Sequence, residues 1–309
     1  MRRFIAIPVL CFCAVAAAAQ SGDLGWRTDP QPAVAEAKRL NRPLMVYVLG
    51  ATRDRDEKLD DAQRRAFSDL RVQRLAQRFV PLKLSRSVHR DVLKDFGLPE
   101  SANMVMSFVT PEGKPLGDLG AAGIAQADSL AAKMKLVLRA YVEQLYESDL
   151  KPLLTDADAK PADVKRALQA VAEQRILAAE SDLVAMLERE KRDAAVRPAV
   201  CEALAALSTK TAVTKLLDLS GTGDRTAAKA LEKCTQAGAE LLLGMLKPDD
   251  EPFDYPLYKL ITKVCGIREV KPEKWFDTAK PKARQEHFDK LDKLVRDAAA
   301  AWKEANDAD

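Results

Sequence analysis

The chain has 309 residues, 47% of them apolar and 31% charged, a composition typical of a globular protein with room for two domains. Lysine and arginine number 49 against 46 aspartate and glutamate residues, which gives a net charge of +3. Because positive and negative charges are nearly equal in number, the chain does not belong to the strongly basic class of nucleic-acid-binding proteins. The same balance gives no reason to expect an anionic membrane as a partner.

The amino-terminal segment differs from the rest of the chain. A short basic start is followed by an apolar run over residues 4–15 and by four alanines at 16–19. This pattern predicts a secretory signal peptide, residues 1–19, cleaved after Ala19. A membrane anchor is the alternative, but the apolar run is shorter than the roughly 20 residues of a spanning helix. We therefore expect an exported protein, periplasmic or secreted, without an integral membrane segment after cleavage.

The next part of the chain alternates between helical and extended patterns. We expect a continuous apolar strand at residues 44–49, with both faces covered. The turn Thr-Pro-Glu-Gly at residues 110–113 predicts an antiparallel pair of strands around it. The pattern predicts helices at residues 32–40, 53–65, 70–78, 88–96 and 129–146, and further strands at 79–84, 104–109 and 114–119. Strands that alternate with helices favour an α/β domain, here with a mixed sheet flanked by helices.

Three groups of residues in this part carry a resemblance to a known family. They are Trp26 with residues 33–38 and 42–46, residues 67–72 with 79–84, and residues 96–97 with 104–113. In order and spacing they resemble thioredoxin-like proteins of the exported bacterial type, over about residues 24–146. The resemblance implies a thioredoxin-like domain, to which we assign residues 24–148.

The departures from that family concern its redox chemistry. Arg53 and Asp56 occupy the two positions of the family's Cys-x-x-Cys motif, and neither side chain can act as a thiolate nucleophile. Met104 or its neighbour Asn103 fills the place of the family's cis-proline, and Tyr47 that of a buried acidic residue. The resemblance therefore implies a scaffold without disulfide exchange.

The degenerate active-site position remains a candidate surface for a protein or peptide partner. We assign to it Thr52, Arg53, Asp54, Asp56 and Met104. The alternative is structural, because carboxylates in the first turn of a helix stabilise the helix dipole by about 0.3–1 kcal/mol each.

Strand patterns stop after Asp149, and a segment rich in proline and aspartate, residues 151–161, suggests a domain boundary. Amphipathic helices are predicted at residues 162–175, 181–190, 194–207 and 211–219. Equivalent positions recur every 31–33 residues, as between Cys201, Cys234 and Cys265. This period resembles degenerate HEAT-like repeats and predicts an α-solenoid over residues 160–270.

Residues 271–309 are expected to form a capping helix region that closes the solenoid or docks on the first domain, with partner binding as the alternative. A main helix should start at Pro281. Its apolar stripe is predicted to contain Phe288, Leu291, Leu294 or Val295, Ala298 and Trp302.

The remaining chemistry is sparse. After removal of the signal peptide three cysteines are left, an odd number, and we interpret them as small core residues. Only His89 and His287 could add imidazole ligands, so we expect no metal and no cofactor.

The sequence thus favours a non-catalytic thioredoxin-like binding or scaffold protein of the cell envelope. Two alternatives stay open: a thiol-disulfide oxidoreductase or isomerase that uses Cys201, Cys234 or Cys265, and a structural subunit of an envelope assembly.

Overall fold

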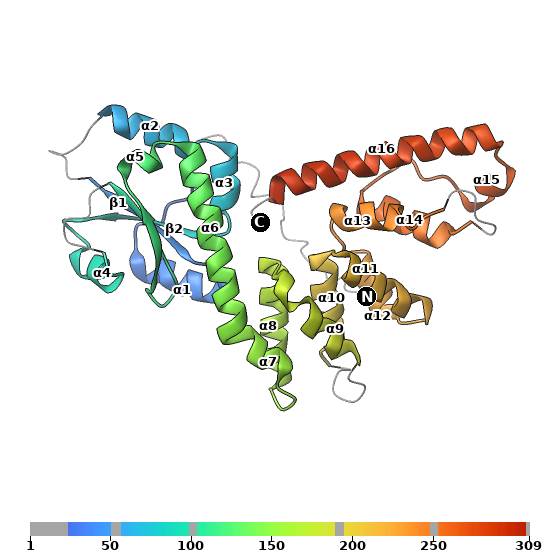
Figure 1. The fold of residues 1–309 in the computed structure, drawn as a ribbon, viewed down its shortest axis with the longest axis horizontal. Coiled ribbons are helices and arrows are strands. Elements are labelled where there is room, and N and C mark those ends of the chain that lie inside the picture. Colours follow the sequence, from blue (N-terminus) through green and yellow to red (C-terminus); the bar gives the residue numbers. More distant parts are fainter. Residues whose placement is uncertain (1–23, 51–56, 99–103, 189–194, 248–252, 307–309) are drawn as a thin grey trace, which may run out of the picture. The chain divides into compact units, whose positions relative to one another are not determined.

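The fold consists of two compact units, residues 1–138 and residues 139–309 (Figure 1). The structure is a computed structural model that describes residues 24–50, 57–98, 104–188, 195–247 and 253–306. The signal-peptide prediction lies outside the described residues. Helix α6 (Ala127–Leu145) runs across the division between the units.

The first unit is built on a mixed sheet. Its strands are β1 (Leu44–Leu49), β2 (Val80–Ser85), β3 (Val105–Val109) and β4 (Pro115–Leu119), in the spatial order β2-β1-β3-β4. Strand β1 is parallel to β2 and antiparallel to β3, and β3 is antiparallel to β4. The mixed α/β sheet predicted from the sequence is confirmed, including the antiparallel pair around the Thr-Pro-Glu-Gly turn.

Helices cover both faces of this sheet, which explains why β1 is apolar throughout. Side chains alternate along a strand, so every second residue of β1 faces the same layer. One face packs against α1 (Pro30–Leu40) and α4 (Arg90–Asp95) in a fully buried cluster that includes Ala33, Ala37, Leu44, Val46, Val48 and Leu93. The opposite face carries Tyr47, whose ring packs on Phe67 of α2 (Glu57–Phe67).

The two edges of the sheet differ. Beyond β2, the segment before α1 adds one bridge: the Arg27 amide donates to the Pro81 carbonyl at 3.0 Å, and the Lys83 amide donates to the Arg27 carbonyl at 2.8 Å. The other edge is β4, a five-residue strand that begins with proline. Short edge strands with proline are poor templates for another strand, because proline offers no amide hydrogen.

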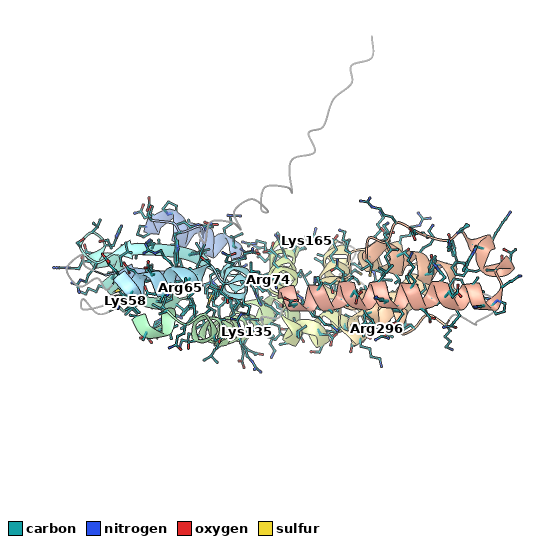
Figure 2. All side chains as sticks on the ribbon, turned by 90° about the horizontal axis from the view of Figure 1, so that it is seen from above. Lys58, Arg65, Arg74, Lys135, Lys165 and Arg296 are labelled. Atoms are coloured by element: carbon teal, nitrogen blue, oxygen red, sulfur yellow. The ribbon has the colours of Figure 1, made fainter. Side chains whose placement is uncertain are left out.

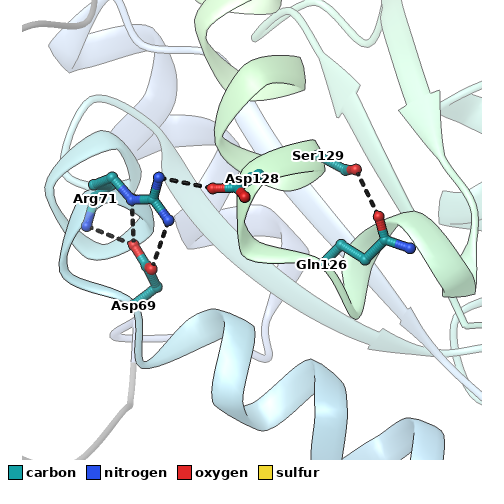
Figure 3. Close-up of polar contacts among 5 residues, drawn as sticks. All are labelled: Asp69, Arg71, Gln126, Asp128 and Ser129. Atoms are coloured by element: carbon teal, nitrogen blue, oxygen red, sulfur yellow. Dashed lines mark hydrogen bonds and ion pairs between the residues drawn. The ribbon is translucent and has the colours of Figure 1, made fainter.

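An exposed ion pair links helix α3 (Leu70–Ala76) to the start of α6 (Figure 3). The Asp69 carboxylate caps α3 by accepting from the Arg71 amide at 2.9 Å. The Arg71 guanidinium pairs with Asp69 at 2.9 Å and reaches Asp128 at 2.7 Å. The guanidinium lowers the pKa of the Asp69 carboxyl by hydrogen bonding to it. A short helix, α5 (Ala121–Ile124), precedes α6.

In its described residues the second unit is helical. A π-helical turn (Tyr146–Leu150) continues α6, and a 3-10 turn (Leu177–Ala179) precedes α9. The helices are α7 (Lys151–Thr155), α8 (Pro161–Gln174), α9 (Glu180–Glu188), α10 (Arg197–Leu207), α11 (Lys210–Gly221), α12 (Arg225–Leu231), α13 (Gln236–Leu243), α14 (Tyr255–Val264), α15 (Glu273–Thr278) and α16 (Pro281–Asn306). The predicted linker at residues 151–161 contains a helix, α7. Pro152 does not prevent this helix, because it lies in the first turn, where proline is tolerated.

Two ion pairs of this unit each join residues that are 31 positions apart in the sequence. Lys233 pairs with Glu202, 31 residues earlier, and Lys263 pairs with Glu232 over the same separation. The half-buried Arg197 holds Asp224, the N-cap of α12, at 2.7 Å. We call the pairs Glu202–Lys233 and Glu232–Lys263 the charge ladder.

The predicted last helix starts at Pro281, as expected, but its buried stripe differs in detail. The fully buried positions are Phe288, Leu291, Val295 and Ala299. Leu294 is 41% exposed, and Ala298 and Trp302 are half-buried. A spacing of three, four and four residues keeps these positions on one face of a straight helix. No helix in the described parts of the chain is both long and apolar enough to cross a lipid bilayer.

Candidate functional site

Of the five residues predicted to form a binding position in the first unit, the structure describes only Met104. Thr52, Arg53, Asp54 and Asp56 lie outside the described residues. Met104 directly precedes β3, has a left-handed backbone with φ of 49°, and is 3% exposed. Non-glycine residues rarely adopt this conformation, and when they do they often lie at functional sites. Because the side chain is buried, a partner at this position would meet the Met104 backbone.

Tyr47 of β1 forms a buried hydrogen-bonded pair with Gln63 of α2. The Tyr47 hydroxyl donates to Gln63 Oε1 at 2.6 Å, and Gln63 Nε2 donates to the Ala121 carbonyl at 3.0 Å. Both side chains are buried. The Tyr47 ring packs on Trp26 and Phe67, with centroid distances of 5.8 and 5.5 Å. This pair links α2 and α5 to the sheet and contains no carboxyl group.

Basic side chains lie on α2, α3 and α6 in the first unit, among them the labelled Lys58, Arg65, Arg74 and Lys135 (Figure 2). Acidic side chains lie between them, and Arg64 pairs with Asp61 on the same helix. The hollow beside Arg64 and Arg65 has a volume of about 480 Å³ and is lined mainly by alanines and short polar residues. This surface has mixed charge and offers no deep apolar recess.

The three described cysteines lie in the second unit and are all free. Cys201 is fully buried and Cys234 is 7% exposed, which confirms their interpretation as core residues, whereas Cys265 is half-buried. Burial raises the pKa of the Cys201 and Cys234 thiols to about 11, and it also raises the pKa of Cys265. A reactive thiol needs the opposite shift, because the thiolate is the nucleophile.

An aromatic cluster surrounds His287 near the start of α16. The Tyr258 hydroxyl lies 3.1 Å from His287 Nε2 and accepts the Lys271 amide at 2.9 Å. The rings of Trp275 and Phe276 pack on the imidazole, and a small cavity of about 250 Å³ adjoins it. Burial, and then the charges of Lys271 and Lys290, lower the pKa of His287. Within the described residues no group of three or more histidine, cysteine, aspartate or glutamate side chains could hold a metal ion.

A large hollow surface in the second unit forms a groove. It has a volume of about 1260 Å³ and is lined by residues of α11, α12 and α14 and of the segment that leads into α15. Its apolar lining is half-buried at Leu217, Leu260 and Ile267 and includes Val270, which is 40% exposed. We call this surface the helical groove.

Sequence reasoning missed both the Tyr47–Gln63 pair and the helical groove. A signal for the pair was present, because Leu59, Gln63 and Phe67 follow one another at four-residue spacing on α2, which puts the glutamine on the apolar face. The only sequence signal for the groove is that its helices carry apolar residues in addition to those of their buried stripe.

Comparison of the chain with models of known protein families and with curated protein sequences finds no match.

Proposed function

We propose that this chain is a non-catalytic binding or scaffold protein of the cell envelope, with a thioredoxin-like first domain and HEAT-like helical repeats in the second. The sheet order β2-β1-β3-β4, with a parallel first pair and an antiparallel second pair, is compatible with the thioredoxin-like fold that the sequence resembles. The charge ladder, repeated at 31 residues, supports stacked helical repeats. The export of the protein rests on the amino-terminal sequence alone.

The observation that carries the proposal is the absence of cysteine from the part of the sequence that forms the sheet. Residues 14–200 contain no cysteine, so the first unit has no thiol within its own sequence after residue 13. The cysteines of the second unit are largely buried, and burial raises their pKa values. A thioredoxin-like scaffold under these conditions can present surfaces to a partner, but it lacks the nucleophile for disulfide exchange.

Insulin reduction by the full chain tests this proposal against the oxidoreductase alternative. The control is a variant in which all three cysteines are replaced: Cys201→Ala, Cys234→Ala and Cys265→Ser. We expect the same background rate for both proteins. A rate for the parent chain clearly above that of the cysteine-free variant would overturn the non-catalytic proposal.

Thiol labelling of the native protein gives a second readout. A pKa of about 11 instead of the ordinary 9.0 lowers the thiolate fraction of Cys201 and Cys234 near neutral pH about a hundredfold. We expect both to react with a disulfide reagent only after denaturation, and Cys265 to react first. Rapid labelling of Cys201 or Cys234 in the folded chain would favour the oxidoreductase.

A further inference from the structure

The size of the helical groove argues against a small molecule as its natural occupant. Pockets for small ligands usually measure about 300–1000 Å³ and bury most of the ligand surface. The helical groove measures about 1260 Å³ and is partly open to solvent. A surface of this extent suits a segment of another protein.

The walls of the groove determine the conformation of that segment. Helices α11, α12 and α14 form most of it, and their backbone amides and carbonyls are largely paired within each helix. An extended peptide would find no row of free backbone groups there and would leave its own groups without partners. A helical segment satisfies its own backbone and can lay an apolar face into the groove.

The charges around the groove indicate which residues the bound segment should carry. Four acidic and two basic side chains line it. Glu232 is paired with Lys263 at 2.7 Å, and the Lys259 ammonium lies over the Tyr255 ring at 5.9 Å. Asp254 caps α14. Among the described residues no cation pairs with the exposed Asp218 or Glu273, so the groove keeps a negative rim although the whole chain carries a charge of +3.

We propose that the helical groove binds an amphipathic helix of a protein partner, with apolar residues on one face and lysine or arginine residues beside them. The apolar face would cover Leu217, Leu260 and Ile267, and the basic residues would approach Asp218 and Glu273. This proposal rests on the binding function proposed above and assigns that function a surface and a class of partner.

The test uses the full chain and a fluorescein-labelled amphipathic helical peptide made of leucine and lysine. A matched peptide of leucine and glutamate is the counterpart. Fluorescence anisotropy should show saturable binding of the lysine peptide and little binding of the glutamate peptide. Added sodium chloride should weaken the binding, because salt screens charges at an exposed rim.

Two variants locate the binding site. Asp218→Asn/Glu273→Gln removes the two rim carboxylates without changing the size of either side chain, and should weaken binding of the lysine peptide about three- to tenfold. The control, Asp163→Asn/Glu173→Gln on α8, removes the same charge outside the groove and should leave binding unchanged. Leu260→Asp should reduce binding further, while circular dichroism checks that this variant is folded.

Three outcomes would overturn the proposal: no saturable binding of the lysine peptide, equal binding of both peptides, or an equal loss in the groove and control variants. Sedimentation of the chain alone adds a fourth outcome. If the parent chain self-associates and the Asp218→Asn/Glu273→Gln variant does not, the groove binds a second copy of the chain instead of a partner helix. Insulin reduction separates the two proposals. A redox-active chain defeats the proposed function whatever the peptide does, whereas a failed peptide test in a redox-silent chain defeats the groove alone.

Discussion

At the scale of single residues, the interior of the first unit depends on a polar contact in an otherwise apolar layer. Tyr47 and Gln63 are buried, and the hydroxyl of one donates to the amide oxygen of the other at 2.6 Å. A typical hydrogen bond adds only about 0.5–1.5 kcal/mol, but a buried group that loses its partner costs about 1–3 kcal/mol. The pair therefore matters most when only one member is changed.

Tyr47→Phe should lower the free energy of unfolding by about 1–3 kcal/mol, because Gln63 Oε1 then loses the hydroxyl that donates to it. The double variant Tyr47→Phe/Gln63→Leu should be less destabilised than the sum of the two single changes, since the Ala121 carbonyl keeps the Ala125 amide as a donor. Urea unfolding followed by circular dichroism measures all four proteins. Strict additivity would contradict the role assigned to the pair.

His287 should make stability depend on pH. Its pKa is lowered in the fold, so the unfolded chain binds a proton more readily as the pH falls below the ordinary value of about 6.5. The imidazole thus contributes stability that is present above pH 6.5 and is lost as the pH falls through the folded pKa. Lys271 and Lys290 oppose its protonation, whereas Glu269 and Glu286 line the same cavity and bring negative charge.

The measurement is the urea midpoint at pH 7.5 and at pH 5.5. We expect His287→Gln to cost about 1 kcal/mol at the higher pH, through the weakened contact with Tyr258, and to reduce the loss of stability on acidification. His89→Gln, which changes the only other histidine of the chain, is the control. If His287→Gln and the parent lose the same stability between the two pH values, His287 is not the responsible group.

The residues of the candidate site were predicted less well than the core. Periodicity identifies which positions are buried, because every second residue of a strand and every third or fourth residue of a helix faces the same side. It does not identify the partner of a buried polar group. Gln63 meets Tyr47 only because α2 lies across β1, 16 residues away in the chain, and that packing follows from the whole sheet. The predicted surface at residues 52–56 stays a prediction.

At the scale of elements, the charge ladder links α10 to the end of α12 and the end of α12 to α14. Glu232 and Lys233 are neighbours in sequence, yet Glu232 pairs forward with Lys263 and Lys233 pairs back with Glu202. All four side chains are well exposed, so each pair contributes only about 0.2–1 kcal/mol.

Reversing one charge of the ladder tests this interpretation. Lys233→Glu should destabilise the chain by about 0.5–1 kcal/mol, since it places two carboxylates opposite each other. The exchange Glu202→Lys/Lys233→Glu should restore most of the loss, and the difference should shrink at high salt. Thermal unfolding of the three proteins measures the effect. A double variant as unstable as Lys233→Glu would show that these two side chains do not interact.

The elements themselves were largely predictable, and the boundaries of β1 agree with the predicted strand at residues 44–49. That segment combines a continuous apolar run with a proline before it, so local and tertiary preferences coincide. The stripe of α16 was predicted less accurately because Leu294 and Val295 are both apolar, and only packing shows that Val295 is the buried one. Helix α7 was missed because prolines and aspartates are read as linker residues, although proline is compatible with a first helical turn.

At the scale of the whole molecule, the chain contains two bodies with different construction. The first unit has a sheet covered by helices on both faces, and the described part of the second unit consists of helices that follow one another along the chain. The sequence predicts this contrast, because strand periodicity ends before residue 150. The sequence does not predict where one unit ends and the next begins, because α6 is one continuous helix across residues 138 and 139.

Two bodies with separate cores should unfold with different denaturant profiles. The dependence of unfolding free energy on denaturant scales with the surface exposed, so a probe in one unit should report a slope that fits that unit and not all 309 residues. Trp26 contacts Tyr47 and Phe67 in the first unit, and Trp275 contacts Phe276 and His287 in the second. Each tryptophan therefore reports on the core around it.

We expect the variant that retains only Trp26 and the variant that retains only Trp275 to differ in urea midpoint, while circular dichroism of either shows a broader transition that spans both. Replacement of the other tryptophans by phenylalanine keeps the apolar packing, and circular dichroism of both variants against the parent controls for its effect. If both fluorescence curves and the circular dichroism curve superimpose, with the steep slope of a protein of this length, the two units unfold as one cooperative body in solution.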